Sequence, residues 1–222
     1  MSQVWPTKEW TEYLELVRER PELFRQDERL SIIFDEEEVK AFVADTGKPI
    51  GVAYRSPYNL MVVDLVRAPG GKPFAYERLI PASTGSAVIT IPRYEGKFAL
   101  LRQFRHSLRG EQYAFPRGFG EDGLSAEENA AKELEEELGA FVLSCVRLGN
   151  VVSDSGVSGN GAAVILCRIE CPECKKGYEG IQGVALLDEA SLQELIASGQ
   201  VNDGYTLAAW TLLQAYEAQS QK

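Results

Sequence analysis

The chain has 222 residues, of which 45% are hydrophobic and 25% charged, and its formal net charge at pH 7 is -10. This apolar content can build a sizeable core and excludes wholesale disorder. The acidic balance excludes binding along a nucleic-acid backbone or to an anionic membrane, because both need a cationic surface. The opening residues are polar and no stretch reaches membrane-spanning length, so we expect a cytoplasmic protein without a secretory signal.

Hydrophobic periodicity predicts most of the secondary structure. Apolar residues at helical spacing from Trp10 to Val17 predict a first helix, and Pro21 breaks it before a short second turn. Residues 35–51 are predicted to be irregular, or a short helix and a turn. Strands are predicted at 60–66, 74–80, 87–91, 98–104, 141–151 and 162–169, with another near Val184. Further helices are predicted at 125–138, 189–198 and 205–218.

Helices are inserted among strands along the chain, and this order predicts an α/β or α+β fold, a sandwich of helices and a mixed sheet. We expect residues 1–84 to form an N-terminal extension of helix and antiparallel strands. Residues 85–222 are expected to form the main domain. No internal repeat or low-complexity segment interrupts it.

The cysteines allow two interpretations. Cys167, Cys171 and Cys174 are closely spaced, and a fourth zinc ligand would have to come from Cys145 or from His106, the single histidine. Reduced thiols in and beside a loop are the favoured interpretation, because a cytosolic disulfide is not expected. A zinc site stays open as the alternative.

Residues 115–139 are the most informative stretch. The first half has glycines at 118, 120 and 123, which predict a loop whose backbone amides can approach a ligand. The second half predicts a capped helix, with a capping box from Ser125 to Glu128 and a C-terminus closed by Gly139.

One edge of this predicted helix is acidic. With about 3.6 residues per turn, Glu133, Glu136 and Glu137 lie together beside an apolar stripe. Neighbouring carboxylates repel, and a divalent cation that prefers oxygen ligands, Mg²⁺ or Mn²⁺, would relieve the repulsion. An ordinary solvated acidic helix is the alternative, and the glutamates alone would favour it.

The whole stretch resembles the Nudix box, written G-x5-E-x7-R-E-U-x-E-E-x-G-U, where U is apolar. Seven positions fall in register: Gly118, Glu133, Leu134, Glu136, Glu137, Gly139 and Ala140. Leu124 and Lys132 stand where the family has a glutamate and an arginine that pair, so Lys132 must find another partner or face water. The resemblance implies a Nudix-type α/β/α sandwich and a hydrolase that uses Mg²⁺ or Mn²⁺.

Other elements are similar to the ADP-ribose pyrophosphatase branch of the Nudix family. The sequence Gln-Phe-Arg at 103–105 and Pro-Arg-Gly at 116–118 stand where the branch has Q-[FY]-R and P-A-G, and residues 202–209 resemble its D-x-x-T-x-x-A run. The sequence departs from the pattern of this branch at Ala114, at Arg117 and at residues 153–156. ADP-ribose or another nucleotide sugar is therefore the leading substrate, and other nucleoside diphosphate derivatives stay open.

The resemblance assigns Glu133, Glu136 and Glu137 to the metal, with the backbone carbonyl of Arg117 as a further ligand. Glu136 and Glu137 are thereby catalytic candidates. In this branch the base that activates water is often a glutamate on a downstream loop, where Glu179 lies. An ordinary loop carboxylate is an equal alternative for that residue.

The predicted substrate contacts are Arg105, Arg117 and Gly118. An arginine fork suits a phosphate, and the motif position favours Arg105. Arg102 is the other basic candidate on the same strand, but on a regular strand it points to the opposite face from Arg105.

The resemblance predicts an enzyme that cleaves the pyrophosphate bond of a small nucleoside diphosphate derivative. A catalytically reduced Nudix-like domain that binds a nucleotide or a protein partner is the alternative. The retained carboxylates favour the enzyme, because a binding module has little reason to keep mutually repelling charges on one edge. Many members of the branch complete a homodimer with the strands that correspond to 60–80, so the resemblance also implies a dimer.

Overall fold

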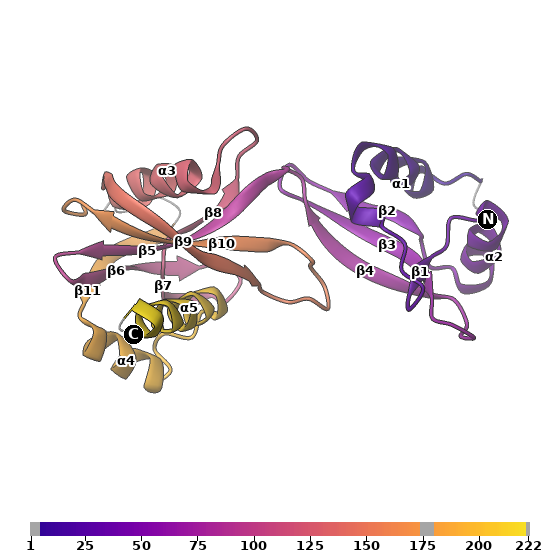
Figure 1. The fold of residues 1–222 in the computed structure, drawn as a ribbon. Coiled ribbons are helices and arrows are strands. Elements are labelled where there is room, and N and C mark those ends of the chain that lie inside the picture. Colours follow the sequence, from indigo (N-terminus) through magenta and orange to yellow (C-terminus); the bar gives the residue numbers. More distant parts are fainter. Residues whose placement is uncertain (1–4, 174–179, 221–222) are drawn as a thin grey trace. The chain divides into compact units, whose positions relative to one another are not determined.

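The computed structural model describes residues 5–173 and 180–220. The chain divides into two compact units, Met1–Ala82 with Asp154–Asn160, and Ser83–Ser153 with Gly161–Lys222. Each unit has its own β-sheet and helices (Figure 1), which confirms the expected mixed α and β class.

The first unit opens with helices whose ends follow from local sequence. α1 (Lys8–Glu19) begins after Thr7, whose side chain accepts a hydrogen bond from an amide of the first turn at 3.2 Å. α2 (Glu36–Thr46) begins after Asp35, which caps it in the same way at 2.9 Å. It ends at Gly47, whose φ of 68° is readily adopted by glycine.

The other elements of this unit are η1 (Pro21–Phe24), β1 (Ser31–Ile32), β2 (Gly51–Arg55), β3 (Asn59–Arg67) and β4 (Phe74–Pro81). The predicted first helix and the strands at 60–66 and 74–80 are confirmed. In segment 35–51 the second alternative is confirmed, since it holds the helix α2 and a turn at Gly47 and leads into β2. β2 is short, and its stability comes from pairing with β3, which local sequence does not reveal.

β3 is the central strand of this antiparallel sheet. β4 pairs with it from Asn59↔Pro81 to Val66↔Phe74, and β1 and β2 pair with its other edge. The core of the unit contains side chains from α1, α2 and all four strands.

A polar network lies buried in this core. The Tyr13 hydroxyl donates to Asp64 Oδ1 at 2.5 Å, and the Arg78 guanidinium donates to both Asp64 oxygens, at 2.5 and 3.1 Å. Asp64 is 2% exposed, so its charge depends on these two donors. Arg78 also donates to the Leu23 carbonyl at 2.9 Å. The network therefore ties the centre of the sheet to α1 and η1.

The second unit contains β5 (Gly85–Tyr94), β6 (Lys97–Arg105), β7 (Gly110–Ala114), β8 (Arg117–Gly120), α3 (Ala126–Leu138), β9 (Val142–Val152), β10 (Gly161–Ile169), β11 (Ile181–Leu187), α4 (Glu189–Ala197) and α5 (Gly204–Ser220). Its strands form one mixed sheet, in which β5 and β10 are parallel and the other pairs are antiparallel. The predicted helices and the predicted strands of this unit are confirmed.

Alternate side chains of this sheet build two cores. Val88 of β5 and Ile165 of β10 pack in one core with α3. Their neighbours Ile89 and Val164 pack in the other core with α4 and α5. α3 therefore covers one face of the sheet and α4 and α5 cover the other (Figure 1), which confirms the expected sandwich.

The segment before α3 is not the glycine-rich loop that the sequence predicts. Gly118 and Gly120 lie in strand β8, and only Gly123 of the three glycines has a positive φ, of 87°. β8 pairs with β5, and the short β7 before it pairs with β6. Such short strands depend on distant partners and carry no periodic pattern of their own.

The described part of the chain holds no helix with both the length and the apolar character that crossing a bilayer requires.

The Tyr13–Asp64 hydrogen bond predicts a pH-dependent stability. Burial, followed by the Asp64 charge and hydrogen bond, raises the pKa of Tyr13 well above its usual range. A raised folded-state pKa stabilises the fold fully below the unfolded value of about 10, and that contribution is lost as pH rises above it. We expect Tyr13→Phe to cost about 1–2 kcal/mol at pH 7 and its difference from wild type to shrink by pH 10.5. Urea unfolding at both pH values measures this, and a difference that stays constant or grows with pH would contradict it.

Candidate active site

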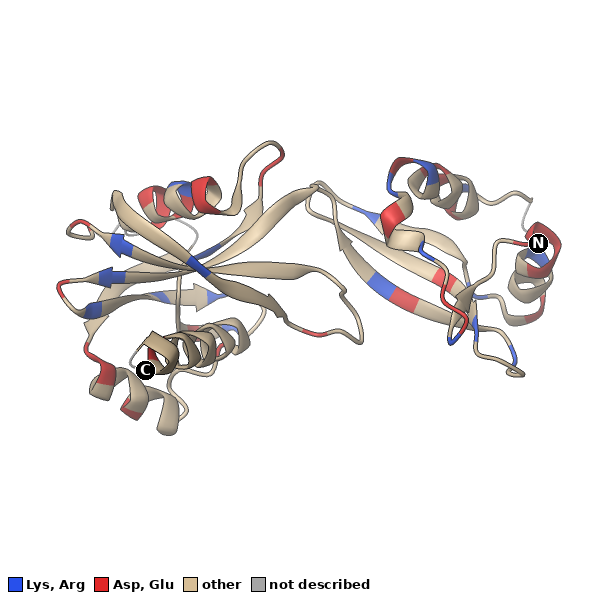
Figure 2. Cartoon of the chain, in the orientation of Figure 1, with Lys and Arg blue, Asp and Glu red and all other residues tan. Residues whose placement is uncertain are grey.

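Helix α3 carries the predicted metal-binding glutamates, and both of its ends are fixed. The Ser125 hydroxyl accepts from the Glu128 amide at 3.2 Å and Glu128 Oε2 accepts from the Ser125 amide at 2.8 Å, which forms the predicted capping box. Gly139 ends the helix with a φ of 60°. Figure 2 shows acidic residues along α3, and their register is set by these two caps.

Glu133 lies directly against β8. A Cβ atom on Gly118 would stand 1.8 Å from Glu133 Oε1 and 2.0 Å from Glu133 Cδ, so only glycine leaves room for this carboxylate. Gly118 pairs with Val88, whose side chain packs in the core of α3. The structure therefore brings together two of the predicted site residues, one on the strand and one on the helix.

β8 also runs very close to β5. A Cβ atom on Gly120 would stand 2.0 Å from the carbonyl carbon of Gly85. Asn129 of α3, which is 1% exposed, holds both strands through its Nδ2, which donates to the Phe119 carbonyl at 3.0 Å and to the Ser86 carbonyl at 3.2 Å. Asn129 lies one helical turn before Glu133, so it fixes β8 beside that carboxylate. No sequence pattern identifies Asn129, and only its burial reveals this contact.

Lys132 has two carboxylate partners. Its Nζ forms a close ion pair with Glu121, in the loop after β8, and lies 3.7 Å from Glu136 Oε1. The hydrogen bond with Glu121 is the main reason that the pKa of Lys132 is raised above its usual value. Leu124, which stands at the position of the first glutamate of the box, is half-buried. The ion pair with Glu121 therefore joins the loop after β8 to α3.

The acidic edge of α3 differs in burial along its length. Glu137 is 4% exposed, and Glu133 and Glu136 are half-buried. Carboxylate oxygens suit Mg²⁺ or Mn²⁺. Because Gly118 has no side chain, a cation bound by Glu133 would lie close to the backbone of β8. Across residues 5–173 and 180–220, no three His, Cys, Asp or Glu side chains are gathered closely enough to hold a metal ion. That Glu133, Glu136 and Glu137 bind one cation together therefore stays a prediction.

The end of β6 carries Arg105. β6 pairs regularly with β7 from Leu101↔Ala114 to Arg105↔Gly110, so its alternate side chains face opposite sides. Leu101 packs in the core of α3, and Arg105 shares its parity. Arg105 therefore projects on the face of the sheet that α3 covers, and Arg102 projects on the other.

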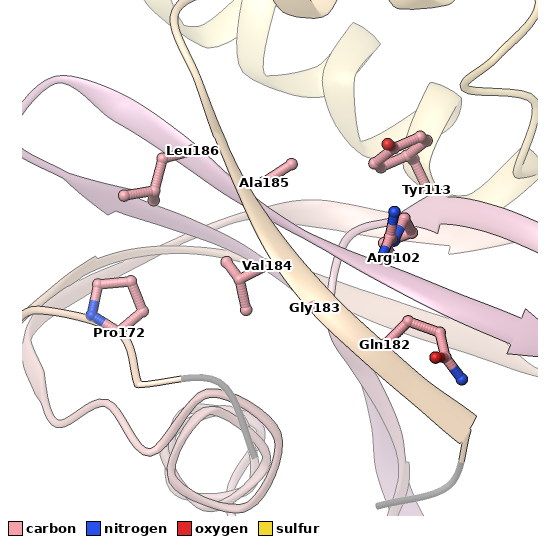
Figure 3. Close-up of a pocket in the computed structure, with 8 residues that line it drawn as sticks. All are labelled: Arg102, Tyr113, Pro172, Gln182, Gly183, Val184, Ala185 and Leu186. Carbon is pink, nitrogen blue, oxygen red and sulfur yellow. The ribbon is translucent and has the colours of Figure 1, made fainter. Parts of the chain in front are cut away.

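Arg102 instead lines an open hollow of about 420 Å³ at β11 (Figure 3). The other lining residues are Tyr113, Pro172, Gln182, Gly183, Val184, Ala185 and Leu186. Gly183 and Val184 are successive residues of β11, which pairs only with β6 among the described strands. Residues from both faces of this edge strand therefore line the hollow. The hollow includes none of the α3 glutamates, and we assign it no function.

The side chain of Arg117 is held on the sheet face opposite Glu133. Arg117 pairs with Ile89, which packs in the core of α4 and α5. Its Nη1 lies 2.8 Å from Asp203 Oδ1, and its guanidinium stacks over Tyr205, with 5.0 Å from Cζ to the ring centroid. The predicted positive charge near a phosphate is thus engaged by a carboxylate. Asp203 belongs to the D-x-x-T run, which is the sequence signal that could have identified this partner.

Glu179 and Cys174 lie outside the described residues. Cys145, Cys167 and Cys171 are free thiols, and Cys145 pairs with Cys167 across β9 and β10. Burial raises the pKa of Cys167 to about 12. The zinc alternative depends on Cys174, so it stays a prediction.

We expect substitution by alanine to affect stability differently at the two glycines of β8. In Gly120→Ala the new Cβ meets the Gly85 backbone, which cannot move without separating β5 from β8, so we expect a loss of about 1–3 kcal/mol. In Gly118→Ala it meets only the flexible end of Glu133, so we expect a loss under about 1 kcal/mol and a displaced carboxylate. Urea unfolding of both variants and a crystal structure of Gly118→Ala measure these effects. Equal losses, or an unmoved Glu133, would be contrary results.

Comparison with known proteins identifies the family of the domain that holds this site. Residues 83–168 match the family model of the NUDIX domain. The ADP-ribose pyrophosphatase of Bacillus subtilis (strain 168) is 29% identical over 180 residues, which cover 77% of this chain and 96% of that protein. The crystal structure of an ADP compounds hydrolase has the same fold, with a TM-score of 0.67 and 18% identity over 78% of this chain and 93% of that one. Residues 83–168 of this chain therefore form a Nudix domain.

Proposed function

We propose that this chain is a divalent-metal-dependent hydrolase that cleaves the pyrophosphate bond of a nucleoside diphosphate derivative. The observation that carries the proposal is the Glu133 carboxylate seated at Gly118, on the same helix as the buried Glu137. Neighbouring carboxylates on one edge of a helix repel, and a divalent cation bound by their oxygens would relieve that repulsion. ADP-ribose and other nucleotide sugars are the leading substrates, supported by the name of the Bacillus subtilis relative.

Glu133, Glu136 and Glu137 would hold Mg²⁺ or Mn²⁺, with the backbone carbonyl of Arg117 as a further ligand. A bound cation of this kind neutralises charge on a diphosphate and lowers the pKa of a coordinated water. Lys132 lies beside Glu136 and partly balances the negative charge of this edge.

The proposed roles of the other residues follow from their places in the sheet. Arg105, on the face that α3 covers, would bind phosphate oxygens with its guanidinium fork. Gly118 would let substrate approach the backbone of β8, and Arg117 would contribute through its backbone, since Asp203 engages its side chain. Glu136 and Glu137 would act in catalysis at the cation, and Glu179 would accept the proton of the attacking water.

A non-catalytic domain that binds a nucleotide or a protein partner is the second candidate. One observation favours it: Lys132 stands between Glu121 and Glu136 and could take the place of a cation at one glutamate. Against it, three carboxylates that repel one another are kept on one edge of α3, which a binding module has little reason to do.

We also propose that the first unit contributes to a homodimer. Tyr54, Met61 and Leu79 are cross-strand neighbours on one face of its sheet, and Tyr54 and Leu79 are 62% and 42% exposed. In a homodimer these apolar side chains would contribute to the contact between the two copies. The cytoplasmic location stays a prediction.

The proposed function predicts magnesium-dependent turnover that depends on two of the glutamates. We expect AMP to be released from ADP-ribose or another nucleoside diphosphate derivative in a substrate panel, and Glu136→Gln and Glu137→Gln each to lower kcat by at least about 100-fold. Glu135→Gln is the matched control, because it removes the same charge from an exposed position of α3 and should stay within about twofold. Failure of the wild type to hydrolyse any member of the panel with Mg²⁺ or Mn²⁺ would exclude the enzyme.

A further inference from the structure

The three residues that precede Gly118 are each held by a separate contact. The Phe115 amide donates to Thr206 Oγ1 at 3.0 Å. The Pro116 carbonyl accepts from the Thr90 amide at 2.9 Å and from its hydroxyl at 3.0 Å. Arg117 is bound by Asp203. Because Thr90 and Thr206 are fully buried, water does not compete for these bonds.

Asp203 is the centre of this set of contacts. Its Oδ1 accepts from Arg117, and its Oδ2 accepts from the Thr206 amide at 3.0 Å and from the Thr206 hydroxyl at 2.8 Å. The side chain of Asp203 is 8% exposed and that of Arg117 25%. A carboxylate at this depth needs all three of these donors, and among them the arginine supplies the positive charge. Asp203 thus joins the beginning of α5 to the beginning of β8.

We propose that the Arg117–Asp203 pair positions β8, and with it the contact between Gly118 and Glu133 on which cation binding depends. The inference rests on the proposed function, since it concerns the same carboxylates. Arg117 and Gly118 are successive strand residues on opposite faces, so a shift of the Arg117 backbone moves Gly118 directly. The side chains of Arg117 and Asp203 have a positioning role: they act through the strand and do not themselves contact the reacting atoms.

A second ion pair provides a matched control. Arg93 Nη1 lies 2.8 Å from Glu217 Oε1, and this pair also joins the sheet to α5. It contacts β5 near its C-terminal end, and it does not contact β8. Asp203→Asn and Glu217→Gln are both isosteric and remove one charge each from a pair between the sheet and α5.

The test uses the full chain and two measurements without substrate. Hydrogen exchange of residues 115–120 reports the order of β8, and Mn²⁺ binding by electron paramagnetic resonance reports the cation site. We expect Asp203→Asn to speed exchange at 115–120 by at least about tenfold, with β10 within about twofold, and to weaken Mn²⁺ binding by at least about fivefold. Glu217→Gln should leave both readings within about twofold.

Arg117→Met repeats the test from the other partner, and Arg117→Lys should recover part of the Mn²⁺ affinity because a cation again faces Asp203. Equal exchange at 115–120 in Asp203→Asn and Glu217→Gln would overturn the proposal. The proposal would also fail if Mn²⁺ binding stayed unchanged while the amides of β8 exchanged faster. It would fail as well if Arg117→Lys bound Mn²⁺ no more tightly than Arg117→Met. A wild type that binds no Mn²⁺ overturns this proposal together with the proposed function. A wild type that binds Mn²⁺ but hydrolyses no substrate contradicts the proposed function alone.

Discussion

The close approach of β8 to two neighbours is the constraint on which the candidate site depends. At Gly118 the strand meets the Glu133 carboxylate, and at Gly120 it meets the backbone of Gly85, so neither position has room for a Cβ atom. Gly120 is therefore required by the neighbouring backbone and Gly118 by the placement of the Glu133 carboxylate, and neither is required by an unusual φ. Asn129 holds this arrangement from α3 through two backbone carbonyls. A strand this short could not by itself hold a carboxylate in place, and the surrounding contacts supply the rigidity.

A buried ionic network lies in each of the two units. In the first unit Asp64 is surrounded by Tyr13 and Arg78, and the network joins the sheet to the helices that cover it. In the second unit Asp203 joins α5 to the strand that carries Gly118. Buried ion pairs add little net stability, but removing one partner is costly because the other charge stays buried. Such pairs fix one geometry, which matters most next to a site where small displacements change activity.

Local sequence predicts those parts of the fold that local contacts stabilise. The capping box from Ser125 and the closing Gly139 define α3 within a residue or two, and the long strands β3, β5, β6 and β10 appear as apolar runs. β2, β7 and β8 have few residues and gain their stability from partners distant in sequence. The same reason explains Arg117, which is predicted to face a phosphate but binds Asp203, 86 residues away. Lys132 follows the expectation that it needs a partner, although Glu121 could not have been selected among several nearby carboxylates.

We propose that Glu133, Glu136 and Glu137 bind one or more divalent cations against β8. Anomalous diffraction from crystals of the whole chain soaked in Mn²⁺ would locate such cations. We expect an anomalous peak within about 2.0–2.4 Å of carboxylate oxygens of at least two of these glutamates, near the Arg117 carbonyl. An empty map at this edge of α3, or manganese bound only elsewhere in a crystal with clear density for all three side chains, would contradict it.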